Sequence, residues 1–321
     1  MIITVTLNPA VDKTVEIDDC RLDAVNRIKS SRLDAGGKGI NVSKTIASLG
    51  GTSRAIGILA GKTGAMIEEC LTQTGIAHAF LQGSGETRMN LKIVDKLNGR
   101  NTDINETGPR VSAEMIAQLK EQCVNSLREK DILVLSGSVP PGVEKDVYRE
   151  WIRAAKENGV RTVLDADGEL LQAGLEAGPY LIKPNIHELE RLAGERLEGE
   201  AATAEFARTL CSRYGIEVVV VSLGGEGALF VTAQEAYLTR GLRVAVQSTV
   251  GAGDAMVAGL ALALEREADW NDLICLAVAA GTASVMTGGT EPGGRTLVEE
   301  LAKQVKWEKL EEREKKRSNE R

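Results

Sequence analysis

From about residue 110 onward, short apolar runs alternate with helical patterns along the chain. The runs cover residues 132–135, 161–164, 180–182 and 218–221. Apolar strands that alternate with helices are typical of a parallel sheet with both faces covered. The pattern therefore predicts an α/β fold, in which a mainly parallel β-sheet is flanked by helices on both faces.

Small or polar residues follow each of these runs. They occupy residues 136–138, 165–167, 183–185 and 222–225. In open α/β sheets ligands bind outside the carboxyl ends of the strands, so we expect these four segments to line one rim. Their convergence predicts a ligand site at that rim.

Two stretches break the alternation and carry mixed polar and apolar β patterns. They span residues 8–35 and 86–106, and Asn98 and Gly99 mark a turn in the second stretch. A few-stranded sheet with one covered face needs a partner surface. We therefore expect a small β-sheet lid, which closes over the site or pairs with a second copy to form a homodimer.

The same patterns divide the chain into a core, the lid and a tail. The core residues are 1–7, 36–85 and 107–307. Residues 308–321 are almost all charged, so we expect them to be disordered or to extend a helix, without a catalytic role.

Composition restricts the ligands that the site can take. With 321 residues, 43% of them hydrophobic, the chain can bury the core of one main α/β domain. A net charge of −7 argues against nucleic acid or an anionic membrane as a partner. A phosphate-bearing ligand must therefore be met by a few local Lys and Arg side chains.

Cysteine and hydropathy patterns exclude other classes of protein. Five cysteines lie far apart and only two histidines accompany them, so neither a zinc site nor a disulfide framework is indicated. No apolar stretch reaches the roughly 20 residues that span a bilayer, and the N-terminal strand pattern carries no basic leader. We expect a cytoplasmic protein without a membrane partner.

Residues 248–254 place two glycines and a carboxylate where an apolar run gives way to a helical pattern. Gly251 and Gly253 let the backbone approach an anion, and the helix that follows directs free N–H groups at it. Asp254 then lies as a base beside an anion hole, which suits phosphoryl transfer. The alternative is an ordinary glycine turn with a capping Asp.

Two further segments offer cations. Residues 36–43 hold Lys38 among glycines that lead into a helix, which makes either a compact anion site or a structural turn. Arg88, Asn90 and Lys92 alternate on one face of an expected strand. That face either binds a polar anionic ligand or is solvated.

Metal and nucleotide candidates lie after two of the apolar runs. Asn185 and Glu188 are three residues apart, so their oxygens can face one Mg²⁺ that keeps several waters. The glycine-rich residues 222–228 suit the phosphates or ribose of a nucleotide. Residues 57–63 miss the P-loop spacing by one residue, and no G-x-G-x-x-G follows the first strand. A nucleotide-binding oxidoreductase is therefore a weaker second hypothesis, and a catalytically silent scaffold is a third.

Four of these motifs occur together in one order. They are G-G-K-G-x-N at 36–41, K-P-N-x-x-E at 183–188, S-L-G at 222–224 and G-A-G-D at 251–254. Together they resemble the ribokinase-like (PfkB) carbohydrate kinases over nearly the whole chain. The resemblance implies a small β lid, ATP and Mg²⁺, and phosphorylation of a sugar hydroxyl. It also implies that Asp254 takes the hydroxyl proton, while the N–H groups of Gly251, Ala252 and Gly253 form the anion hole.

Other segments are similar to the sugar-phosphate branch of that family, which includes 1-phosphofructokinase, tagatose-6-phosphate kinase and the minor 6-phosphofructokinase. They are residues 6–12, 87–92 and 136–142, with Ser248 where many members have Asp. Lys38 speaks against the minor 6-phosphofructokinase, and residues 102–105 look most like 1-phosphofructokinase. The resemblance therefore implies that fructose 1-phosphate is converted to fructose 1,6-bisphosphate, with tagatose 6-phosphate or fructose 6-phosphate as the alternative acceptor.

The resemblance gives each candidate residue a role. Acceptor binding falls to Lys38 and Arg88 for the phosphate, Asp12 for the hydroxyls, and Gly37, Asn41, Asn90, Lys92 and Ser138 around them. Nucleotide binding falls to Lys183, Asn185, Ser222, Gly224, Gly225, Glu226, Gly227 and Ser248 with Gly251 and Gly253, and the metal to Asn185 and Glu188. We expect Asp254 to keep a pKa near 3.9, because a helix N-terminus favours its charge.

Overall fold

A computed structural model describes residues 1–310 of the chain. Its large sheet contains β1 (Ile2–Thr6), β4 (Ser53–Ala60), β5 (Ala77–Gly83), β8 (Ile132–Ser136), β9 (Arg161–Asp165), β10 (Leu181–Ile182), β11 (Val218–Ser222), β12 (Gly227–Val231), β13 (Ala236–Arg240) and β14 (Trp307–Lys309). The spatial order is β14-β13-β12-β11-β10-β9-β8-β1-β4-β5. Neighbours from β5 to β11 run parallel, and the remaining pairs run antiparallel.

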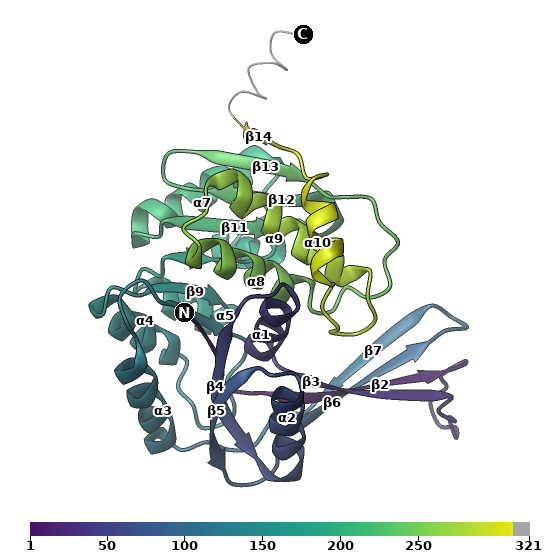
Figure 1. Ribbon diagram of the computed structural model, residues 1–321. Coiled ribbons are helices and arrows are strands. Elements are labelled where there is room, and N and C mark those ends of the chain that lie inside the picture. The colour runs from purple at the N-terminus through teal and green to yellow at the C-terminus, as the bar shows by residue number, and fades with distance from the viewer. Residues whose placement is uncertain (311–321) are drawn as a thin grey trace.

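Helices cover both faces of this sheet (Figure 1). They are α1 (Lys38–Ser48), α2 (Gly61–Gln73), α3 (Ala113–Ser126), α4 (Val147–Glu157), α5 (Gly168–Leu175), α6 (Ile186–Ala193), α7 (Gly199–Tyr214), α8 (Ala252–Glu265), α9 (Trp270–Val285) and α10 (Arg295–Ala302), with a 3₁₀ turn η1 (Gly224–Glu226). Adjacent residues of one strand pack into hydrophobic cores on opposite faces of the sheet. Ile2 of β1 belongs to the buried cluster that includes residues of α1, α8, α9 and α10, whereas Ile3 belongs to the cluster that includes residues of α3 to α7. The expected parallel sheet with two covered faces is confirmed, because strands buried on both sides must be apolar throughout.

The carboxyl ends of four adjacent strands form one rim. The strands β8, β9, β10 and β11 end at or just before Ser136, Asp165, Lys183 and Ser222. An isolated bridge between Asn185 and Ser222 extends the pairing of the last two strands. The polar segments that follow the apolar runs therefore do converge.

A second sheet has four strands, which are β2 (Ala10–Ile17), β3 (Ser30–Gly36), β6 (Arg88–Asp95) and β7 (Arg100–Asn105). Their order is β3-β2-β6-β7, with β2 and β6 parallel and both outer pairs antiparallel. We call this sheet the lid. It projects from the core as an arm (Figure 1). Its base joins a core cluster through Val11 and Ala35, against which Met89 of β6 also packs.

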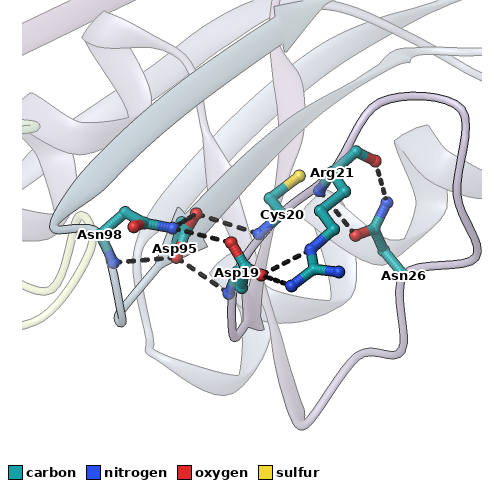
Figure 2. Close-up of polar contacts among 6 residues, drawn as sticks. All are labelled: Asp19, Cys20, Arg21, Asn26, Asp95 and Asn98. Carbon is teal, nitrogen blue, oxygen red and sulfur yellow. Dashed lines mark hydrogen bonds and ion pairs between the residues drawn. The ribbon is translucent and has the colours of Figure 1, made fainter.

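One carboxylate ties the two loops at the far end of the lid. Asp95 ends β6, and its oxygens accept hydrogen bonds from the backbone N–H groups of Asp19, Cys20 and Asn98 at 3.0–3.1 Å and from Asn98 Nδ2 at 2.9 Å (Figure 2). These donors, the Asn98 side chain first, lower the pKa of Asp95 to about 2. The β6–β7 turn at Asn98 is thereby joined to the loop between β2 and β3.

The start of the expected charged tail forms a strand, which the sequence analysis did not predict. Trp307–Lys309 forms β14, which pairs with Tyr237 to Thr239 of β13 at the edge of the sheet. The expectation of disorder or helix is therefore wrong at residues 308 and 309, because backbone pairing and the contact of Trp307 with Tyr237 outweigh local charge. Residues 311–321 lie outside the described residues.

The described part of the chain also bears on membrane insertion. No helix within residues 1–310 combines the length and the apolar character that a membrane span requires.

Candidate active site

A cavity of about 500 Å³ lies where the core rim meets the lid. It brings together most of the candidate residues, from segments up to about 240 positions apart. These are Asp12, Gly37, Lys38, Asn41, Arg88, Asn90, Lys92, Lys183, Asn185, Glu188, Ser222, Gly251, Gly253 and Asp254. We call it the acceptor cavity.

Asp254 occupies the third position of α8. The helix begins after Gly251, whose positive φ of 82° favours glycine. The Asp254 side chain is only 7% exposed, and its Oδ2 accepts a hydrogen bond of 2.8 Å from Asn41 Nδ2. The carboxylate is therefore oriented by α1 while it lines the cavity.

Burial changes the acidity of Asp254. Desolvation, with the nearby charge of Asp165, raises the pKa of Asp254 to about 6. The cations Lys38 and Lys183 and the Asn41 bond oppose this rise without cancelling it. The pKa therefore lies above the unperturbed value near 3.9, because loss of water outweighs the helix N-terminus, but the carboxylate is still mostly ionised at pH 7. The carboxylate is a stronger base than the sequence suggests.

Asp165 joins two lysines below the cavity. It ends β9, is 1% exposed, and its Oδ1 lies 3.2 Å from Lys38 Nζ and 3.5 Å from Lys183 Nζ. Burial alone would raise the pKa of Asp165, but the two ammonium groups hold it below its ordinary value. Burial lowers the pKa of Lys38, yet the surrounding carboxylates, Asp165 first, raise it above its ordinary value. Lys38 therefore stays charged beside Asp254.

The lid supplies the opposite wall. The Arg88 guanidinium donates to the backbone oxygen of Asn8 at 3.0 and 3.3 Å and to that of Glu106 at 3.3 Å. Asn90 Nδ2 donates to Asp12 Oδ1 at 2.8 Å. Lys92 Nζ lies 3.7 Å from Asp103 Oδ1. The polar face of β6 is thus directed at the cavity.

A second, apolar cavity of about 710 Å³ adjoins the first. Both cavities are lined by Ser222 and Gly253. The glycine loop contributes Gly224, Gly225 and Gly227, and Ala252 starts α8 beside them. The apolar wall consists of Leu242, Val244, Val246, Met256, Val278 and Val285. A flat apolar group with a polar tail fits these two spaces in sequence, with the tail toward Asp254.

Three candidate residues lie elsewhere. Ser138 lines a smaller cavity of about 300 Å³, which shares Lys38, Arg88 and Glu188 with the acceptor cavity. Glu226 lines a third cavity on the far side of the glycine loop. Ser248 lines none of these cavities, and its Oγ accepts a bond from Val250 N at 3.2 Å.

The two metal candidates, Asn185 and Glu188, hydrogen-bond to each other. Asn185 Oδ1 accepts from Glu188 N, and Glu188 Oε2 accepts from Asn185 N, both at 2.9 Å. This capping box starts α6 and could have been predicted from the N-x-x-E spacing. It leaves one carboxylate oxygen of Glu188, which lines the cavity, for an ion. Within residues 1–310 no three acidic, His or Cys side chains form a metal cluster, so the pair fits only a cation that keeps waters or phosphate oxygens.

Sequence reasoning gave no site role to several residues that line the cavity, among them Asp34, Asp165 and Thr290. Asp165 lies in the segment 165–167 that the sequence places at the rim, but the sequence assigned it no role. Asp34 lies in the lid stretch 8–35, whose β pattern does not show which side chains face the site, and only the folded chain brings Asp34 and Thr290 to the cavity.

Comparisons with known proteins agree on one family. The sequence model of the pfkB family of carbohydrate kinases matches residues 5–296. The chain is 42% identical to a 1-phosphofructokinase of Xanthomonas campestris over 83% of this chain and 85% of the relative. It is 35% identical to a tagatose-6-phosphate kinase of Staphylococcus epidermidis over 95% of this chain and 98% of the relative. A solved structure of Escherichia coli phosphofructokinase-2 with substrates and products is 32% identical, with a TM-score of 0.90 over 94% of this chain and 98% of that chain.

Proposed function

The chain belongs to the pfkB family of carbohydrate kinases, and from this premise we propose that it transfers the γ-phosphoryl group of ATP to fructose 1-phosphate. It is a sugar-phosphate kinase, as relatives at 35–42% identity indicate. The product of the proposed reaction is fructose 1,6-bisphosphate. The observation that carries the proposal is that Lys38 and Arg88 line the same cavity as Asp254. An acceptor that already bears a phosphate meets cations at one end and a base at the other.

The acceptor phosphate binds where the two polar cavities share Lys38 and Arg88. Ser138 lines that shared end and accepts from Asn8 Nδ2 at 3.3 Å, so its hydroxyl proton is free for a phosphate oxygen. Asp12 faces the middle of the cavity, where the sugar hydroxyls lie. The remaining hydroxyl then points to Asp254.

Asp254 acts as the base. With a pKa of about 6, roughly nine-tenths of the carboxylate is ionised at pH 7. Asn41 holds Oδ2, which leaves Oδ1 to accept the proton of the sugar hydroxyl. The free N–H groups at the start of α8, at Gly251, Ala252 and Gly253, stabilise charge on the transferring group.

ATP occupies the apolar cavity with its phosphates toward Gly253. A Cβ at Gly224 or Gly225 would meet nothing within 4 Å, so this loop leaves open space for a ligand. Lys183 Nζ would lie 3.3 Å from a Cβ at Gly253, which puts a fixed cation beside the phosphate path. Asn185 and Glu188 would hold Mg²⁺, and the ion would neutralise phosphate charge when bound. Both substrates are metabolites of the cytoplasm, where we place the reaction.

The lid covers the acceptor and is also a candidate dimer surface. We propose residues 8–35 and 86–106 as the lid unit and the remainder of 1–307 as the core. Leu33 and Ile104 on the outer strands are 48% and 53% exposed, which suits pairing with a second copy. A tetrameric form is known for Escherichia coli phosphofructokinase-2, and we propose a homodimer through the lid for this chain.

A coupled ADP-release assay with three acceptors tests the proposal. Fructose 1-phosphate, tagatose 6-phosphate and fructose 6-phosphate are compared at equal ATP. We expect the highest kcat/KM with fructose 1-phosphate. A higher value with tagatose 6-phosphate supports the alternative kinase of the same branch, and transfer to none of the three contradicts the proposed function.

A further inference from the structure

The lid carries two opposed carboxylates, of which the proposed reaction uses only Asp12. Asp12 of β2 and Asp34 of β3 are register partners in an antiparallel pair, so their side chains lie on the same face of the sheet. Both line the acceptor cavity. Like charges directly opposite each other on neighbouring strands destabilise a sheet. A destabilising pair that faces a cavity is typical of a functional site.

Each of these carboxylates is held by a neighbouring donor. Asn90 Nδ2 donates to Asp12 Oδ1 at 2.8 Å, and Arg32 Nε donates to Asp34 Oδ2 at 2.8 Å. Burial raises the pKa of Asp12, and the charge of Asp34 adds to the rise. The Asp34 side chain is only 16% exposed. Two oriented acceptors therefore face the cavity from adjacent strands.

A turn of the core holds Asp34 from the other side. Gly289 lies between α9 and α10 with a φ of 61°, and a Cβ there would lie 1.5 Å from Arg32 Nη2 and 3.1 Å from Asp34 Oδ2. A Cβ at Gly288 would lie 3.1 Å from Arg32 Nη1. The guanidinium therefore lies directly against this turn, where the two glycines leave it room. Arg32 and the turn together fix Asp34 at the junction of lid and core.

The next residue of that turn has a polar atom without a partner. Thr290 is 7% exposed and lines the same cavity, yet its Oγ1 makes no hydrogen bond. It lies beside the start of α8, since a Cβ at Gly251 would be 3.8 Å from Thr290 Cβ. Buried polar groups are nearly always hydrogen-bonded, so a ligand is the natural partner for this hydroxyl. The wall between Asp34 and Asp254 is thus lined by groups that suit a polyhydroxylated ligand.

We propose that Asp34 accepts a hydrogen bond from a ring hydroxyl of the sugar, beside Asp12, and thereby sets which sugar phosphates the enzyme accepts. The inference rests on the proposed function. Sugar hydroxyls donate and carboxylates accept, and bonds to an ionised acceptor are the stronger ones. A site that binds a substrate hydroxyl strongly rejects an analogue without it, because its own polar group is then left unpaired.

The test compares Asp34→Asn and Asp34→Ala with the matched control Asp18→Asn. Asp18 is an exposed lid aspartate that pairs with Lys29 outside the acceptor cavity. We expect KM for the sugar phosphate to rise about tenfold in Asp34→Asn and further in Asp34→Ala, with KM for ATP and kcat nearly unchanged. The control Asp18→Asn should keep the wild-type kcat and both wild-type KM values.

Thermal unfolding separates binding from a structural role. We expect Asp34→Asn to unfold at the wild-type temperature or above it, because the repulsion from Asp12 is removed while an acceptor for Arg32 remains. A lower unfolding temperature with an unchanged KM for the sugar phosphate would overturn the inference.

Deoxy analogues of the preferred sugar phosphate identify the hydroxyl. Wild type should lose about tenfold or more in kcat/KM with one analogue, and Asp34→Ala should show no such loss with that analogue. Equal penalties in both proteins for every analogue would contradict the inference. If wild type prefers another sugar phosphate, the substrate proposal fails and the Asp34 variants are compared on that acceptor. If wild type phosphorylates none, both proposals fall.

Discussion

The core rim and the lid contribute different kinds of side chain to one cavity. The core provides buried charges in fixed pairs, of which Asp254, Asp165 and Lys183 are at most 7% exposed. The lid provides partly exposed polar groups, such as Lys92 at 21% exposure. Charges withdrawn from water act strongly and do not reorganise, whereas exposed charges act weakly and move. We infer that the core governs the chemical step, whereas the lid acts on the affinity for an acceptor whose phosphate Lys38 of the core also binds.

Removal of the proposed base should give the largest effect and is the hardest test of this division. We expect Asp254→Asn and Asp254→Ala to lower kcat by about 10³-fold or more with little change in KM for ATP, because the proposed acceptor of the hydroxyl proton is lost while the nucleotide cavity is unchanged. The measurement is steady-state kinetics at saturating sugar phosphate.

Asp272→Asn is the matched control, because Asp272 occupies the same third position of α9 but is exposed. It should keep wild-type kcat. Near-normal turnover of Asp254→Asn would show that Asp254 is not the base. It would also contradict the inference that the core governs the chemical step.

The buried pairing at Asp165 should give the next largest effect. In wild type, kcat should fall as the pH decreases through about 6, because protonation removes the base. Asp165→Asn removes a negative charge that raises the pKa of Asp254, so the acid limb should move to lower pH. It also releases Lys38 and Lys183, for which we expect a loss of about 10²-fold in kcat.

Asp131 provides the control for that substitution. It is a buried, ion-paired aspartate that directly precedes β8, at the amino end of the strand and so at the opposite end from the rim. In Asp131→Asn, kcat should fall at the same pH as in wild type. If the acid limb of kcat is not shifted in Asp165→Asn, Asp165 is only a structural partner of the lysines.

The core strands could be predicted from the sequence for the same reason that the core governs the chemistry. Strands such as residues 218–221 are buried on both faces, so every position is apolar and the pattern is unmistakable. The start of α6 also carries a local signal, since Asn185 and Glu188 have the spacing of a capping box.

Contacts between distant segments could not be predicted in this way. The bond from Asn41 to Asp254 joins residues 213 positions apart, and that from Lys38 to Asp165 joins residues 127 apart. The raised pKa of Asp254 depends on this packing and on burial, which no local pattern encodes. The strand at Trp307–Lys309 could not be predicted from its charged sequence, because its stability comes from pairing with β13.

The smallest expected effect belongs to the exposed pair at the mouth of the lid, where Lys92 Nζ lies 3.7 Å from Asp103 Oδ1 and Asp103 is 57% exposed. Lys92→Ala should raise KM for the sugar phosphate by only about threefold at low salt, and the effect should fade at high salt because exposed charges are screened. Asp103→Asn should lower KM by a similar factor, because it removes a negative charge that repels the incoming phosphate. Steady-state kinetics of both variants at two ionic strengths measure these changes. A salt-independent loss of kcat in Lys92→Ala would instead mean that the lid takes part in the chemical step. The inferred division of roles between core and lid would then be wrong.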